Sequence, residues 1–254
     1  MLKDSLFISS IAFNFMKNKV LIFILIFLPV LTFSQNKNSI SLGVGMLSER
    51  FSDQNLASLD FGGSGYDMFL TIGHRFNQKL NLKGSFDLQK SELSHELIPI
   101  NLTGSYTGIN LILYYEILAK NQNTFSLGMG YTGLFEIREG RESNLYQTND
   151  ILQGLSISPE YKFDMGSVLL SLTAVIPIVS EVNTQAHVGN GEHKSYTASF
   201  HNYLSILTHT QIFFRITPTH FVGMGYSWHL KNNEVAKTIN KAAHTLRVSY
   251  MFHF

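Results

Sequence analysis

The sequence predicts an all-β protein, a transmembrane antiparallel up-and-down β-barrel of about ten strands, within a range of eight to twelve. Three observations support this fold class: apolar and polar residues alternate with a period of two, the alternating segments are long, and short connections follow long ones in turn. Successive side chains of a β-strand point to opposite faces, so the alternation indicates strands with one apolar and one polar face. The charged fraction is 15%, against about 25% in ordinary soluble domains.

The first 34 residues are predicted to be absent from the mature protein. We interpret residues 1–15 as an upstream extension from a misplaced start codon and 16–34 as a cleaved signal peptide. The signal peptide has a basic segment with Lys17 and Lys19, followed by an apolar run at 20–31. The small residues Thr32 and Ser34 precede the predicted cleavage site. The apolar run is shorter than the about 20 residues of a transmembrane helix. The outer-membrane β-barrel is then expected to occupy 35–254.

Ten segments of the remaining chain have the strand pattern. In order they are 39–51, 65–76, 80–89, 105–118, 124–138, 152–164, 167–178, 200–216, 220–230 and 242–254. The last one alternates most regularly, since Leu246 and Val248 belong to one face and Arg247 to the other. The usual length exceeds the about 9–11 residues that a tilted strand needs to cross a bilayer.

The connections separate into two kinds that correspond to the two ends of a barrel. Tight turns are predicted at 77–79, 120–123, 165–166 and 218–219, and long connections at 52–64, 90–104, 139–151, 179–199 and 231–241. Short periplasmic turns and long extracellular loops are typical of membrane barrels. A soluble antiparallel sandwich is the alternative, but its strands average about 5–6 residues and its outer face would carry more Lys and Glu.

Aromatic residues are frequent near the predicted strand ends, where girdles would meet the membrane interfaces. The candidates are Phe51, Tyr66, Phe76, Tyr106, Tyr115, Phe163, Phe221, Trp228 and Phe252. Three Gly-x-Gly pairs lie inside strands and are expected to relieve crowding on the inner face. They are Gly43 with Gly45, Gly128 with Gly130, and Gly223 with Gly225.

The signal peptide, the alternating strands and the ending Tyr250-Met251-Phe252-His253-Phe254 resemble the small outer-membrane β-barrel proteins of Gram-negative bacteria. The resemblance implies an outer-membrane location, contact with outer-membrane lipid and passage through periplasmic chaperones. It also implies that the barrel-assembly machinery reads the C-terminal strand ending at Phe254. The net charge of +1 excludes a nucleic-acid partner.

The inner face is predicted to carry six acids and six bases, which pair with one another in a barrel this narrow. They are Asp67, Asp87, Glu116, Glu136, Glu160 and Asp164, with Arg75, Lys83, Arg138, Lys162, Arg215 and Arg247. For Arg247, Glu160 or Glu136 is the expected partner. A lumen of mixed charge favours a filled interior over an ion-selective pore.

The predicted function is therefore a barrel with a largely filled lumen, structural or adhesive, or binding an unidentified extracellular ligand through its loops. The alternative is a narrow, porin-like channel for small or hydrophobic solutes, and an outer-membrane hydrolase is the third reading. Ser227 and His229 share an inward face, and His187 and His193 with Glu192 form a weak metal pattern. No catalytic, cofactor or metal residues are predicted, and we expect no enzyme.

Overall fold

The computed structural model describes residues 37–53, 59–96, 101–140, 146–188, 192–198, 203–233 and 239–254. The upstream extension and signal peptide predicted at 1–34 lie outside these residues. Eleven strands account for nearly all of the described chain. They are β1 Asn38–Asp53, β2 Leu59–Arg75, β3 Leu80–Ser94, β4 Asn101–Lys120, β5 Asn123–Gly140, β6 Tyr146–Asp164, β7 Val168–Val188, β8 Glu192–Ala198, β9 Tyr203–Arg215, β10 His220–Asn233 and β11 Ile239–His253. Within the described ranges, no helix is long and apolar enough to cross a membrane.

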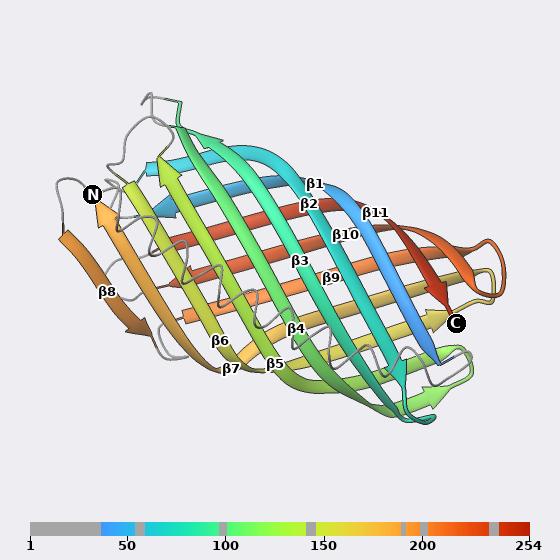
Figure 1. Ribbon diagram of the computed structural model, residues 1–254. Helices are drawn as coiled ribbons and strands as arrows, with labels where there is room; N and C mark the ends of the chain where they lie inside the picture. Colours follow the sequence, from blue (N-terminus) through green and yellow to red (C-terminus); the bar gives the residue numbers. More distant parts are fainter. Residues whose placement is uncertain are drawn as a thin grey trace.

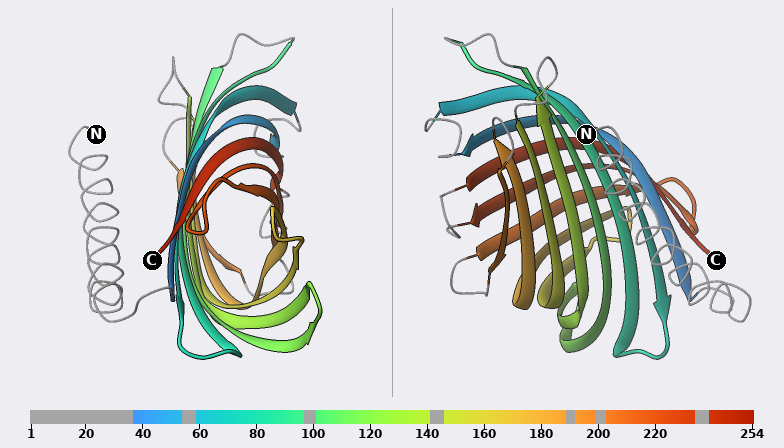
Figure 2. Two further views of the ribbon diagram at one scale, coloured as in Figure 1. Left: turned by 90° about the vertical axis from the view of Figure 1, so that its right-hand side faces the viewer. Right: turned by 60° about the vertical axis from the view of Figure 1, so that its left-hand side comes forward.

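The strands form one closed antiparallel barrel, as the sequence predicts (Figures 1 and 2). Neighbouring strands in chain order pair from β1 to β7 and from β9 to β11, β7 also pairs with β9, and β1 pairs with β11 from Ser39 opposite His253 to Asp53 opposite Ile239. The ring therefore contains ten strands, β1 to β7 and β9 to β11. Both ends of the barrel chain lie with the tight turns, because Phe254 and Asn38 exchange backbone hydrogen bonds.

β8 adds length to the barrel wall without adding a strand to the ring. Val168–Val175 of β7 pairs with β9, and Val182–Val188 of the same strand pairs with β8. β8 thus continues the line of β9 along one edge of β7. The predicted connection 179–199 is largely a β-hairpin, which is a correction to its expected loop structure. Among the described strands, β8 pairs with β7 alone, so its other edge is open.

Apolar side chains form a belt on the outer wall. Met46, Leu246 and Val248 are 79%, 68% and 60% exposed, which in a soluble protein would be unfavourable. Other exposed members of the belt are Leu42, Val44, Met68, Leu113, Leu127, Met129, Ile212, Val222 and Met224. Towards the long-loop end the outer face becomes polar, at Ser48, Arg50, Ser64, Lys90 and Ser105.

The strands continue past this belt at the long-loop end. β4 has 20 residues and β7 has 21, whereas about 9–11 tilted residues cross a bilayer. Most predicted strands are therefore too short at that end, such as 80–89 for β3 and 152–164 for β6. The apolar-out pattern that predicts a strand stops where the outer wall meets water, although backbone pairing continues.

Three of the predicted girdle aromatics face the interior instead. Phe51, Tyr106 and Phe221 are buried, and each of the three rings lies beside a cationic side chain, Arg138, Lys241 and Arg215 respectively. In the alternation along their strands these three residues fall on the inward-facing positions, which residue type alone does not reveal. Tyr66, Phe76 and Tyr115 are exposed on the outer wall as predicted.

Candidate functional site

The interior of the barrel is the candidate site, because its charged side chains gather there in three clusters. The one nearest the long loops, here called the upper ionic cluster, consists of Glu49, Glu136, Arg138, Asp150, Lys231 and Lys241. These residues come from β1, β5, β6, β10 and β11, so the cluster spans the lumen. Three carboxylates meet three cations, and the cluster is formally neutral.

Glu136 is at the centre of the upper ionic cluster. Its carboxylate accepts hydrogen bonds from Arg138 Nη2 at 2.6 Å, Lys231 Nζ at 2.7 Å and Lys241 Nζ at 2.8 Å. Arg138 Nη2 also donates to Glu49 Oε1 at 2.6 Å, and Lys231 contacts Asp150. The three cationic side chains are each 1% exposed. Buried charges of this kind persist only when they are paired, so the cluster seals the barrel at this level.

Buried apolar and aromatic side chains complete the seal towards the long loops. One group consists of Phe51, Phe61, Leu93, Leu102 and Ile239, and the other of Tyr106, Leu134, Leu152, Val182 and Tyr203. The Arg138 guanidinium lies 3.8 Å from the Phe51 ring centroid, and Lys241 Nζ lies 4.8 Å from that of Tyr106. Cations over aromatic faces are attracted by the ring quadrupole. Side chains therefore fill this half of the lumen.

Arg247 organises the second cluster, deeper in the barrel. Its Nε and Nη2 donate to the two oxygens of Asp67 at 2.6 Å and 2.8 Å, and Nη2 also reaches Asp87 Oδ1 at 3.0 Å. Arg247 Nη1 lies 3.0 Å from His209 Nδ1. A guanidinium can only donate, so His209 accepts through Nδ1 and carries its proton on Nε2. These four residues are called the Arg247 cluster.

The third cluster lies towards the short turns and is called the Lys83 cluster. Lys83 of β3 contacts Glu160 of β6, and Lys162 Nζ lies 3.1 Å from the other oxygen of Glu160. Nearby, the hydroxyl groups of Tyr114 and Ser158 are 2.7 Å apart. Lys83 and Lys162 are 21% and 32% exposed, in contrast to the sealed cations of the upper ionic cluster. The two lysines of the Lys83 cluster are thus partly accessible to solvent.

All twelve charges predicted to face inward form ion pairs, eight of them inside the lumen. The other four, Arg75 with Glu116 and Arg215 with Asp164, form ion pairs of 3.6 Å and 3.4 Å at the short-turn rim. Four interior charges are missing from the sequence prediction: Glu49, Asp150, Lys231 and Lys241. The predicted strands 152–164, 220–230 and 242–254 stop short of three of these residues. Asp150, expected at the rim, is buried in β6.

Two residue patterns in the sequence are candidates for a catalytic pair and for a metal site. Ser227 and His229 both face inward and are buried, but His229 Nε2 pairs with Ser205 Oγ at 3.1 Å. His187 and His193 are directly opposite in the β7–β8 register, and Glu192 is opposite Val188. In the part of the chain that the structure describes, no group of three or more His, Asp or Glu side chains is arranged to hold a metal ion.

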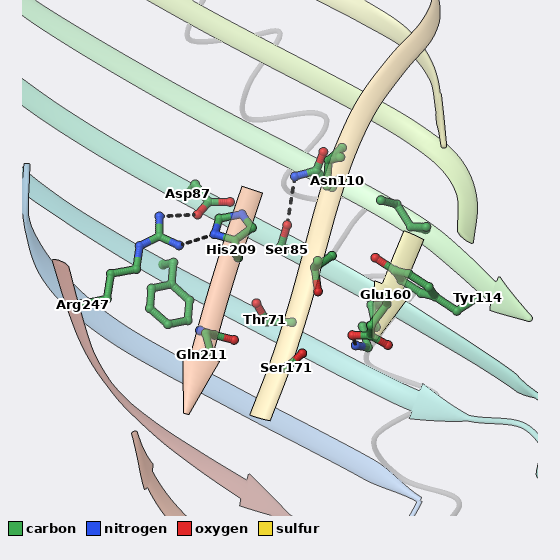
Figure 3. A pocket seen from close by; sticks show the side chains of 15 residues that line it. Thr71, Ser85, Asp87, Asn110, Tyr114, Glu160, Ser171, His209, Gln211 and Arg247 are labelled. Carbon is green, nitrogen blue, oxygen red and sulfur yellow. Dashed lines mark hydrogen bonds and ion pairs between the residues drawn. The ribbon is translucent and has the colours of Figure 1, made fainter. Parts of the chain in front are cut away.

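A cavity of about 100 Å³ separates the Arg247 cluster from the Lys83 cluster (Figure 3). Most of the residues that line it are polar, and they come from β2, β3, β4, β6, β7, β9 and β11. Asp87, His209 and Arg247 lie at one side, and Glu160 and Tyr114 at the other. Thr71 and Ser171 lie between them, and Gln211 lies on the Arg247 side. The cavity therefore lies below the filled long-loop half of the lumen, and a buried apolar group of Phe213, Phe221 and Met251 lies nearer to the short turns.

No protein-family model matches the chain, and no curated protein matches its sequence. Solved structures do match in fold. The outer membrane protease OmpT from Escherichia coli has a TM-score of 0.66 at 10% identity, covering 88% of this chain and 98% of that one. The translocator domain of autotransporter NalP from Neisseria meningitidis has a TM-score of 0.49 at 10% identity, covering 97% and 98%. Neisserial surface protein A has a TM-score of 0.36 at 12% identity, covering 85% and 97%.

Proposed function

We propose that this chain is an outer-membrane β-barrel with a closed lumen that acts through its long loops, as a structural or adhesive protein or as a receptor for an extracellular ligand. The fold of the barrel is that of the outer-membrane proteins, as the sequence predicts. Its apolar belt fits lipid, and in this orientation the long loops are extracellular and the short turns periplasmic.

The filled long-loop half of the lumen is the observation that carries this proposal. Arg138, Lys231 and Lys241 are each 1% exposed, and they join carboxylates from opposite sides of the barrel. A conducting path would have to break this network, which leaves charges buried without partners. A barrel of ten strands is also narrow, whereas water-filled porins have about 16–18 strands.

The projecting β7–β8 hairpin supports a role for the loops. An open strand edge offers unpaired backbone groups to a partner, and extended peptides bind such edges by adding a strand. Loops on a rigid barrel are also where binding functions concentrate. The chemistry proposed here is recognition, without a catalytic step.

Planar-bilayer recording tests the closed lumen. Refolded protein whose insertion is verified by the heat-dependent gel shift is expected to give no discrete conductance steps. Regular steps from the inserted protein would overturn the closed lumen in favour of a narrow channel for small or hydrophobic solutes.

Surface binding tests the role of the loops. Cells that display the barrel are compared with cells that display a variant in which a short Gly-Ser linker replaces Glu192–Ala198. The variant is expected to fold and to lose adhesion or ligand capture, because β8 lies outside the ten-stranded ring. Unchanged binding by the variant would show that the β7–β8 hairpin is not the binding site.

Export is tested by sequencing the N-terminus of protein recovered from outer membranes. Because the predicted cut follows Ser34, the mature chain is expected to begin at Gln35. A chain that retains residues 16–34 would show that this segment is an uncleaved anchor.

A further inference from the structure

The cavity between the Arg247 and Lys83 clusters has no role in the proposed function. It measures about 100 Å³, which is room for several water molecules or a small organic molecule. Access is from the short-turn side, where Lys83 is 21% and Lys162 is 32% exposed. The upper ionic cluster separates the cavity from the long loops. A ligand would therefore enter from the short-turn end.

The two ends of this cavity carry opposite charge. In the Arg247 cluster one guanidinium faces the two carboxylates of Asp67 and Asp87, of which Asp87 lines the cavity, so the cluster has one negative charge in excess. In the Lys83 cluster two ammonium groups face the single carboxylate of Glu160, and Lys83 lines the cavity, so that cluster has one positive charge in excess. The whole set is neutral, but the charges are separated across the cavity.

Groups at both ends keep hydrogen-bonding capacity for a ligand. Asp67 accepts hydrogen bonds on both oxygens from Arg247 and Gln89, whereas Arg247 contacts Asp87 through Oδ1. Among the described residues, Asp87 thus has Oδ2 left over on a cavity wall. Lys83 has three donors and one carboxylate partner, and His209 presents Nε2–H.

The middle of the cavity supplies neutral polar groups. Thr71 and Ser171 line it between the charged ends, and Gln211 lines it on the Arg247 side (Figure 3). Phe69, Ile112 and Val175 add apolar surface. This lining suits a short, flexible chain that carries its charges at its two ends.

We propose that the cavity binds a small zwitterion, with its cationic group at Asp87 and its anionic group at Lys83. The two residues lie four positions apart on the same face of β3, so their Cα atoms are about 13 Å apart. The ligand therefore needs several bonds between its charges, as in an ω-amino acid, and an α-amino acid such as glycine is too short.

Titration calorimetry on the refolded barrel tests the proposal with ligands of matched length. The probes are 6-aminohexanoate, which carries both charges, and hexanoate and hexylammonium, which carry one each. We expect 6-aminohexanoate to bind about tenfold more tightly than either, because only it satisfies both walls. Equal binding of hexanoate or hexylammonium, or no binding of any probe at millimolar concentration, would overturn the proposal.

Two variants locate the site. Asp87→Asn and Lys83→Met are each expected to weaken binding of 6-aminohexanoate about tenfold, since each removes one charged contact. Asp164→Asn, at the rim, is the matched control and is expected to bind like the parent. Unchanged affinity in both cavity variants would show that the zwitterion binds elsewhere. If a variant does not fold, the comparison of the three probes on the parent protein still decides. Because that comparison measures binding, its result is independent of the conductance test.

Discussion

Arg247 occupies a position that its neighbours keep open by having no side chains. Gly45 of β1 and Gly225 of β10 lie directly opposite Arg247 on either side. A Cβ atom on Gly45 would lie 2.9 Å from Arg247 Cγ and 2.5 Å from the backbone oxygen of Leu246. The glycine thus gives the guanidinium the space to reach Asp67, which is the role in relieving crowding that the Gly-x-Gly pairs predict.

Gly45→Ala is expected to destabilise the barrel by about 1–3 kcal/mol, the usual effect of overpacking a filled interior. Gly62→Ala is the control, because a Cβ atom at Gly62 meets nothing within 4 Å. Urea unfolding of both variants in lipid vesicles measures the difference. Equal stability of the two would mean that the inner wall at Gly45 is not crowded.

Arg138→Met is expected to lower the free energy of unfolding by about 3–5 kcal/mol, because the variant leaves three buried carboxylates with two cations and so one negative charge uncompensated. Glu49 and Glu136 would lose contacts of 2.6 Å. Arg215→Met is the matched control, since its pair with Asp164 is 37% and 48% exposed and such pairs contribute about 0–1 kcal/mol. Urea unfolding in lipid vesicles compares the stabilities of the two variants. Similar losses for both would contradict a sealed upper ionic cluster.

The sequence predicts the pairing of Arg247 with a carboxylate but not the partner. Its partners are Asp67 and Asp87 rather than the expected Glu160 or Glu136. Arg247 and Asp67 are 180 residues apart in the chain. The alternation along a strand shows which residues lie on the inner face. The partner of such a residue across a closed barrel depends on the stagger of every strand between the two residues.

Individual strands show where the sequence is informative. Alternation predicts the inner and outer faces of β11 correctly, with Leu246 and Val248 exposed and Arg247 buried. It fails at the long-loop ends, where β10 continues to Asn233 and β6 begins at Tyr146. The contrast between apolar and polar faces exists only where lipid is outside. Beyond the belt the outer face is polar and the inner face carries both charged and apolar residues, so only backbone pairing defines the strand.

Val248→Arg tests the lipid-facing assignment of β11. The variant is expected to cost about 2–4 kcal/mol, the penalty for a basic residue on the lipid face near the bilayer midplane. Ser48→Arg is the control, because Ser48 faces outward beside Arg50 near the end of the belt, where the penalty is about 0–1 kcal/mol. Refolding into vesicles, followed by the gel shift, compares the two. If Val248→Arg folds as well as Ser48→Arg, this face does not contact lipid.

The molecule as a whole is asymmetric along its axis. Ion pairs and apolar side chains fill the long-loop half, whereas the short-turn half contains a cavity with partly exposed lysines. Side chains from strands distant in sequence meet at both levels, so the asymmetry comes from the closed ring rather than from one element. The charged side chains are thus fully buried towards the long loops and partly exposed towards the short turns.

Single cysteines measure this asymmetry directly, because the natural chain has no Cys. Thr71→Cys lies in the cavity and Ser91→Cys lies at the upper ionic cluster, where Ser91 Oγ donates to Glu49 and the residue is 2% exposed. A small membrane-impermeant thiol reagent added to intact cells should label neither site. After the outer membrane is permeabilised it should label Thr71→Cys alone, because water reaches only the short-turn half.

Two exposed positions give the matched controls for sidedness. Glu96→Cys, after β3 at the long-loop end, should react in intact cells, and Gln78→Cys, in a tight turn, should react only after permeabilisation. Labelling of Gln78→Cys in intact cells would reverse the orientation of the barrel. Labelling of Thr71→Cys in intact cells, with Gln78→Cys protected, would instead show a path through the upper ionic cluster. The four sites together therefore distinguish an inverted barrel from an open one, which conductance alone cannot do.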